Sequence, residues 1–185
     1  MSRMANRREF LRGAIGLMAP ALLSAAGKPR QILLIRHGEK TGDKTDPNLN
    51  PRGYARAAAL PDLFAGRFDT PQFLFATLRS AHSNREVETI EPLARRLHLE
   101  IDSRFADEEF AALAKELLAK PVYSGKNLLI CWHHGRIPEF AAALGVSHPP
   151  SPWPDEQFDR VWKIEYSGAG VQFTDLPQHL LEGDS

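Results

Sequence analysis

Two histidine–glycine pairs each follow a short apolar segment of the chain. The first pair is His37-Gly38, after the segment Gln31 to Arg36, and the second is His134-Gly135, after a segment that begins at Asn127. Apolar runs of this length, bounded by polar residues, are typical of buried strands. Open α/β sheets bind ligands at the carboxyl ends of their strands. Two parallel central strands would therefore bring His37 and His134 face to face across one crevice.

A third histidine, His133, directly precedes His134. On an extended backbone neighbouring side chains point to opposite faces, so only one of these two is expected to face the crevice. A lone histidine at a strand end is more often a simple polar terminus. Because the His-Gly pair recurs at two matching positions, we select His134 as the partner of His37.

Two arginines could join the histidines. Arg36 directly precedes His37, and Arg85 lies between the two His-Gly pairs in the sequence. The segment Ser83 to Glu86 has capping-box spacing and predicts a helix that starts there, with Arg85 in its first turn. Free amides and the helix dipole favour an anion at such a place. A guanidinium adds a planar fork that fits phosphate oxygens. Arg36 and Arg85 together with the histidines therefore predict a phosphate site.

Two other kinds of site fit these residues less well. For zinc, the set His37, His133 and His134 shows no recognisable ligand spacing, and the flanking arginines would repel a cation. A Ser-His-Asp hydrolase is disfavoured because the chain has no nucleophile-elbow sequence. We therefore favour an anion site over a zinc site or a serine hydrolase.

Alternating strands and helices must position these residues. Strands are expected at residues 31–36, 72–77, 99–101 and 127–132, and helices at residues 51–63, 83–97, 107–118 and 138–144. A terminal hairpin is expected from strands at residues 160–166 and 171–174, followed by a frayed tail from about Gln178. This alternation predicts a three-layer α/β fold with a mostly parallel central sheet, helices on both faces and a C-terminal hairpin.

Length and composition set outer bounds. The chain has 185 residues, a formal net charge of zero and one cysteine. Residues 27–185 are therefore expected to form a single domain without an internal disulfide, and Cys131 to be a small buried core residue. A balanced charge gives no general attraction to nucleic acid, so no nucleic-acid partner is expected.

The first 26 residues have the layout of an export signal. The segment begins with a basic part that contains Arg7-Arg8 followed by Phe10-Leu11, and an apolar stretch comes next. The small residues from Ser24 to Ala26 are typical of the site where a signal peptide is cleaved. The paired arginines resemble a twin-arginine signal, which predicts the twin-arginine export machinery as a partner and a periplasmic location. The apolar part is too short for stable membrane insertion after signal removal. An amphipathic N-terminal helix is the alternative, but Pro20 and the small residues give it a poor apolar face.

The chain as a whole resembles the histidine phosphatase superfamily, also called the phosphoglycerate mutase-like fold. The segments that carry the resemblance are Leu33–Glu39, Leu49–Arg56, Arg85–Leu93 and His134-Gly135. The resemblance implies that His37 is a nucleophile that takes up a phosphoryl group. It also implies that Arg36, Arg85 and His134 hold the phosphate oxygens of a small phosphorylated substrate, with neither metal nor organic cofactor.

The family also needs a carboxylic acid to protonate the leaving oxygen. The segment Asp107-Glu108-Glu109 supplies the candidates, and we choose Glu109, although acidic residues in a first helical turn are commonly caps. His134 is followed by Gly135 rather than by Asp, which disfavours the acid phosphatase branch. The sixth residue after His37 is Asp43 rather than Asn, which disfavours a mutase. The small phosphatase branch fits best.

The sequence thus leaves two functions open. The first is an exported phosphomonoesterase with a phosphohistidine intermediate on His37, acting on phosphorylated envelope sugars or scavenged phosphoesters if it works outside the inner membrane. The second is a catalytically silent phosphate-binding module of the same fold. For the enzyme, the attacking nitrogen of His37 must be neutral, so its other ring nitrogen needs an acceptor such as a backbone carbonyl.

Overall fold

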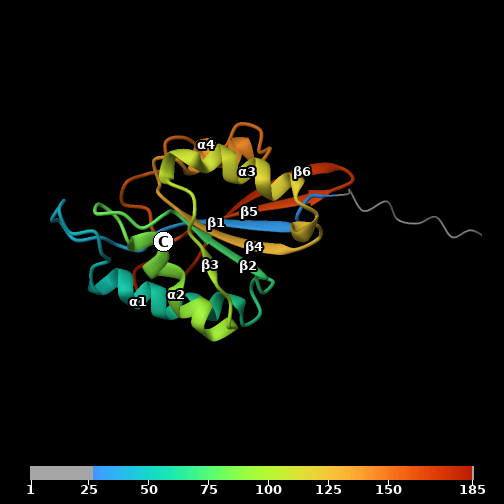
Figure 1. Cartoon of the computed structure of the whole chain (residues 1–185). Coiled ribbons are helices and arrows are strands. Elements are labelled where there is room, and N and C mark those ends of the chain that lie inside the picture. The colour runs from blue at the N-terminus through green and yellow to red at the C-terminus, as the bar shows by residue number, and fades with distance from the viewer. Residues whose placement is uncertain (1–26, 185) are drawn as a thin grey trace, which may run out of the picture.

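The computed structural model describes residues 27–184 (Figure 1). The expected export signal, residues 1–26, lies outside the described residues. From residue 27 to residue 184, no helix is both long enough and apolar enough to cross a membrane.

One six-stranded sheet forms the centre, in the order β3-β2-β4-β1-β5-β6. Its strands are β1 Gln31–Arg36, β2 Phe73–Ala76, β3 Ile101–Asp102, β4 Asn127–Trp132, β5 Arg160–Ser167 and β6 Gly170–Pro177. The first four run parallel, whereas β5 is antiparallel to β1 and forms a hairpin with β6. The predicted fold class is confirmed, with β1 and β4 paired side by side at the centre.

Helices cover both faces of the sheet (Figure 1). Helices α1, Pro51–Ala59, and α2, Arg85–Leu97, lie on one face, and α3, Phe110–Ala119, and α4, Ile137–Ala143, lie on the other. Short 3₁₀ turns span Leu60–Phe64, Asp107–Glu109 and Pro121–Tyr123.

The residues of β1 divide the core into two clusters. Ile32 and Leu34 pack in the cluster that includes α3 and α4 residues, and Leu33 and Ile35 pack in the cluster that includes α2 residues. This division follows from the alternation of side chains along a strand. The middle of a strand buried on both faces is apolar, which is why residues 32–35 form a continuous apolar run.

The two helix starts behave differently. At α1 the expected cap forms, because the side chain of Asn50 accepts a hydrogen bond from the amide of Gly53 at 2.8 Å. At α2 the expected capping box is wrong. Helix α2 begins at Arg85, two residues after the start of the predicted range, and the hydroxyl of Ser83 donates instead to the carboxylate of Glu86 at 2.7 Å.

The C-terminal tail corrects another expectation. Gln178 is only 1% exposed, and Asp184 accepts hydrogen bonds from the buried guanidinium of Arg56 at 2.8 and 2.9 Å. A buried arginine needs anionic partners. The tail supplies one of them, so the described part of the tail is packed against α1 rather than frayed.

Candidate active site

His37 lies directly after β1 and is 1% exposed. Its Nδ1 is 2.6 Å from the carbonyl oxygen of Gly38. We assign the ring proton to Nδ1, since a carbonyl only accepts hydrogen bonds, and this leaves the lone pair on Nε2. Burial, with the charges of Arg36 and Arg85, holds the pKa of His37 well below its usual value. The imidazole is therefore neutral, with Nε2 ready to act as a nucleophile.

A short chain of hydrogen bonds fixes the peptide after His37. The amide of Gly38 donates to the hydroxyl of Thr89 at 2.8 Å, and that hydroxyl donates to the carbonyl oxygen of Arg85 at 2.7 Å. Helix α2 thereby holds the Gly38 peptide that in turn orients the His37 ring. An arrangement of this kind keeps a nucleophile in one geometry before substrate arrives.

Arg36 is almost completely buried at the end of β1. Its Nη1 donates to the carbonyl oxygens of Pro154, Asp155 and Gln157, and its guanidinium lies 3.9 Å from the ring centre of Phe158. Burial lowers its pKa to about 10, which leaves it charged at neutral pH. Its Nε and Nη2 atoms are buried without a hydrogen-bond partner. Two donors of a rigid cation are thus left for an anion.

Arg85 is the first residue of α2 and so lies in its first turn, as the sequence predicted. Its Nη1 donates to the carbonyl oxygen of Asp46 at 3.1 Å and its Nη2 to that of His82 at 3.3 Å, whereas its Nε is buried without a partner. Its charge acts on His37, as the lowered pKa of that residue shows. The structure therefore brings both predicted arginines to His37.

Both histidines after β4 lie near His37, so the expectation that only one faces the site is wrong. The ring centre of His37 is 6.4 Å from that of His134 and 6.0 Å from that of His133. Strand alternation does not separate them because β4 ends at Trp132 and the next residues form a turn. His134 Nε2 lies 3.0 Å from a carboxylate oxygen of Asp155. Burial and the charge of Arg36 lower the pKa of His134 to about 4.

The structure does not bring Glu109 into this group. Its carboxylate is exposed and accepts a hydrogen bond from the amide of Ala106 at 2.8 Å, as a cap of its own turn. Glu108 forms an ion pair with Arg136 at 2.6 Å. Asp107 instead lies 3.8 Å from Nδ1 of His133, and its Oδ1 is buried without a hydrogen-bond partner. Burial, reinforced by the charge of Glu86, raises the pKa of Asp107 to about 6.

Glu86 is a site residue that the sequence reasoning missed. Its side chain is 2% exposed, and its Oε1 lies 4.0 Å from Nε2 of His37. From its place in a first helical turn, the sequence predicts for it only a role in a capping box. Helical spacing was the available signal, because Glu86 shares the inward face of α2 with the buried residues Ile90 and Leu93.

Two cavities adjoin the site residues. One has a volume of about 400 Å³, and its lining includes Arg85, Glu86, Asp107 and His133. The other has a volume of about 360 Å³, and its lining includes His134. The first, which we call the carboxylate pocket, offers room for a leaving group beside His37.

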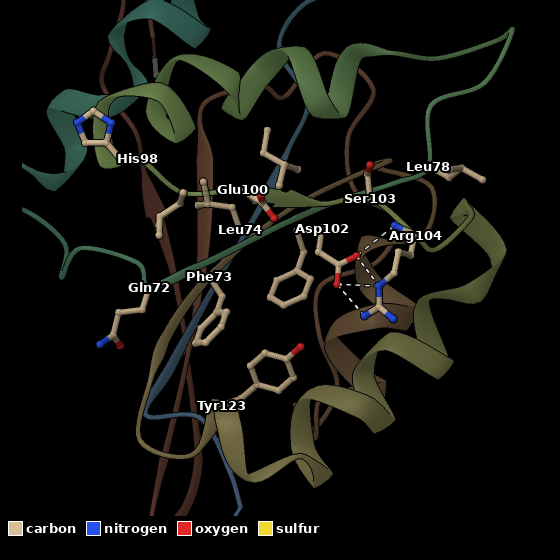
Figure 2. A pocket seen from close by; sticks show the side chains of 13 residues that line it. Gln72, Phe73, Leu74, Leu78, His98, Glu100, Asp102, Ser103, Arg104 and Tyr123 are labelled. Carbon is tan, nitrogen blue, oxygen red and sulfur yellow. Dashed lines mark hydrogen bonds and ion pairs between the residues drawn. The ribbon is translucent and has the colours of Figure 1, made fainter.

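A larger cavity of about 810 Å³ lies elsewhere, at the edge of the sheet formed by β2 and β3 (Figure 2). Phe73 and Tyr123 line it, and an ion pair between Asp102 and Arg104 at 2.7 Å lies beside it. None of the histidines discussed above lines this cavity. It shares Leu78 with the carboxylate pocket, so it adjoins the candidate active site without containing the site histidines.

A metal ion is the other ligand that this histidine group suggests. The nearest ring nitrogens of His37, His133 and His134 lie within 4.8 Å of one another. Arg36 and Arg85 both act electrostatically on His37 and His133. Positive charges so close oppose a cation and favour an oxyanion. The arrangement therefore suits binding and transfer of a phosphoryl group.

The comparisons agree with this chemistry. Residues 32–117 match the model of the Histidine phosphatase superfamily (branch 1). The matched histidine phosphatase segment contains His37, Arg36, Arg85 and Asp107 but ends before His134. No curated protein sequence matches the chain.

Solved structures of several phosphatases share the fold. The protein histidine phosphatase SixA complexed with tungstate is 14% identical, with 80% of this chain and 97% of that chain covered and a TM-score of 0.53. A mycobacterial glucosyl-3-phosphoglycerate phosphatase with inorganic phosphate is 13% identical, with 80% and 95% covered and a TM-score of 0.54. Phosphoserine phosphatase from Entamoeba histolytica with 3-phosphoglyceric acid is 15% identical, with 82% and 99% covered and a TM-score of 0.54. The chain therefore has the phosphoglycerate mutase-like α/β fold.

Proposed function

We propose that this protein is a phosphomonoesterase of the histidine phosphatase superfamily that works through a phosphohistidine on His37. One observation carries the proposal. His37 is buried and neutral, and its Nδ1 donates to the carbonyl oxygen of Gly38. Its Nε2 has no hydrogen-bond partner, and the charges of Arg36 and Arg85 act on the ring. The oxyanions bound in the structures of SixA and the mycobacterial phosphatase support an anion in such a site.

In the first step, the Nε2 lone pair of His37 attacks phosphorus and the bond from phosphorus to the leaving oxygen breaks. Arg36 and Arg85 hold the phosphoryl oxygens and stabilise the charge that they carry in the transition state. The bound dianion raises the pKa of His134, and the protonated ring then donates to a phosphoryl oxygen from Nδ1, which has no other partner. In the second step, water attacks the phosphohistidine, the bond from nitrogen to phosphorus breaks, and inorganic phosphate leaves. His37 is returned to its neutral form.

Asp107 replaces Glu109 as the proposed proton donor. Its carboxyl group lines the carboxylate pocket, and its pKa of about 6 suits proton transfer near neutral pH. A bound phosphate dianion adds negative charge and raises that pKa further. Asp107 gives its proton to the leaving oxygen in the first step and takes one from the attacking water in the second.

The test is turnover of p-nitrophenyl phosphate by wild type, His37→Asn and a matched control, His148→Asn, at an exposed histidine. Wild type and the control should hydrolyse the ester in the presence of EDTA, and His37→Asn should lose at least about 10³-fold in rate. Denatured wild type quenched during turnover should carry acid-labile phosphate on His37. If folded wild-type protein hydrolyses no ester in a broad panel of phosphoesters, the proposed phosphatase activity is refuted.

The catalytically silent module is distinguished by the same assay. It would bind inorganic phosphate and lack turnover. The partial burial of Asp107, whose side chain is 36% exposed, favours the enzyme, because a silent module needs no carboxyl group with a raised pKa.

We also propose export of the protein to the periplasm through the twin-arginine machinery, on the evidence of Arg7 and Arg8. Cell fractionation tests this. The wild-type protein should appear in the periplasm without its first residues, and the double variant Arg7→Lys with Arg8→Lys should stay in the cytoplasm. If wild type and the double variant are distributed in the same way between periplasm and cytoplasm, export by the twin-arginine route is contradicted.

A further inference from the structure

The carboxylate of Glu86 faces the attacking nitrogen of His37 without a proton between them. His37 carries its ring proton on Nδ1, so Nε2 is an acceptor, and Oε1 of a carboxylate is also an acceptor. The two atoms are 4.0 Å apart, both are buried, and neither has a hydrogen-bond partner. Buried carboxylate oxygens are normally paired with a donor or a cation. Glu86 therefore lacks a positive partner in the described part of the chain.

The carboxylate pocket shares this excess of negative charge. It contains Glu86, Asp107 and Glu108 but only one arginine, Arg85. Glu108 is already paired with Arg136, whereas Oδ1 of Asp107 is buried without a partner. The unpaired oxygens are thus those of Glu86 and Asp107, next to the reacting atoms rather than at the rim.

A phosphoryl group on His37 increases the excess of negative charge near Glu86. A phosphate dianion held close to Glu86 is repelled by that carboxylate in a site with little water. The guanidinium groups of Arg36 and Arg85 are in place to hold the phosphoryl oxygens. A cation on the leaving group that enters the carboxylate pocket would give Glu86 the partner that it lacks.

We propose that the preferred substrates are zwitterionic phosphomonoesters, in which the leaving alcohol carries an ammonium group that pairs with the carboxylate of Glu86 and donates a hydrogen bond to the unprotonated oxygen of Asp107. This inference rests on the proposed function. An ammonium has three donors, and Glu86 Oε1, Asp107 Oδ1 and the hydroxyl groups lining the pocket offer acceptors for them. A volume of about 400 Å³ suits a small amino alcohol. A second anionic group on the leaving alcohol would meet the same carboxylates and bind poorly.

Three esters of matched size test this. In O-phosphoethanolamine, n-propyl phosphate and phosphoglycolate, the group two carbons from the phosphate oxygen is cationic, neutral and anionic in turn. Wild type should show kcat/KM at least about tenfold higher for O-phosphoethanolamine than for n-propyl phosphate, as expected for a desolvated ion pair. Phosphoglycolate should be the poorest of the three.

The variant Glu86→Gln keeps the shape of the side chain and removes its charge. It should reduce the preference for O-phosphoethanolamine over n-propyl phosphate to less than about threefold, a ratio that is independent of any change in the overall rate. The control Glu91→Gln, at an exposed position of the same helix, should keep the wild-type ratio. Glu86→Asp keeps a charge and should retain part of the preference.

Two outcomes overturn the proposal. Equal kcat/KM for the cationic and neutral esters in wild type would do so, and this comparison stands even where a variant does not fold. An unchanged preference in folded Glu86→Gln would do so as well. Failure of the proposed function looks different, because it abolishes turnover of all three esters and of p-nitrophenyl phosphate together.

Discussion

Gly53 packs directly on the backbone of Glu39, two residues beyond His37. A Cβ atom on Gly53 would overlap the carbonyl oxygen of Glu39 and lie 2.9 Å from its amide nitrogen. The amide of Asn50 donates to the same carbonyl oxygen at 2.9 Å. The first turn of α1 thus holds the loop that follows the nucleophile.

This contact reverses the usual effect of replacing a helical glycine. Gly→Ala in a helix usually stabilises a protein by about 1 kcal/mol. Gly53→Ala should instead lower the melting temperature and reduce phosphatase turnover at least about tenfold, because the loop after His37 must move. Gly42→Ala, at a position with open space around it, is the control. A melting temperature at or above that of wild type would contradict the prediction.

Asp184→Ala should destabilise the fold by about 3 kcal/mol, because it leaves the buried charge of Arg56 with fewer partners. Arg56 holds the pKa of Asp184 well below its usual value. A carboxyl group whose pKa is lowered by folding stabilises the folded state at pH values above its pKa in the unfolded chain. This stabilisation is lost as the pH falls toward the folded-state pKa. Urea unfolding at pH 7 and pH 3 should therefore show a smaller difference between variant and wild type at pH 3. Asp62→Ala, at an exposed position, should match wild type at both.

Asp107→Asn should slow alkyl phosphate hydrolysis about 100-fold, as loss of a general acid does. Its effect on p-nitrophenyl phosphate should be below about tenfold, because that leaving group departs without a proton. In wild type, kcat/KM for the alkyl ester should fall as the pH rises through about 6, and this limb should vanish in the variant. Glu109→Gln should leave the alkyl rate unchanged. A loss in Glu109→Gln with none in Asp107→Asn would restore Glu109 as the donor.

Asp107→Asn should also stabilise the folded protein at neutral pH. The folded-state pKa of Asp107 is raised from 3.8 to about 6, so its favourable neutral form is lost as the pH rises between those values. Asp107→Asn stays neutral throughout. Its melting temperature should therefore exceed that of wild type more at pH 8 than at pH 4. A constant difference across this range would show that ionisation of Asp107 does not matter to the fold.

Arg36→Lys should weaken inhibition by inorganic phosphate about tenfold or more. A lysine ammonium cannot contact the carbonyl oxygens of the 154–157 loop and also present two donors in one plane. Phosphate inhibition of p-nitrophenyl phosphate turnover measures the loss. Arg95→Lys, on the exposed side of α2, should bind phosphate like wild type.

The sequence by itself determined the features that depend on near neighbours along the chain. The apolar run of β1 and its Arg36-His37 ending predicted both the central strand and the start of the site, because a strand covered on two faces is apolar along its middle and carries polar residues only at its ends. Asn50 before Pro51 predicted the start of α1, since capping is a contact between residues three apart. The alternation of strands with helices predicted the layers for the same local reason.

Only the tertiary structure decided which polar side chains face His37. Glu86 and Glu109 both stand in a first helical turn, and nothing local to either shows that one is buried beside the nucleophile and the other exposed. His133 joins the site because a turn replaces strand geometry after Trp132. Asp184 packs because Arg56, far away in the sequence, is buried and needs an anion. Burial and charge pairing between distant segments come from packing of the whole chain, so local spacing cannot reveal them.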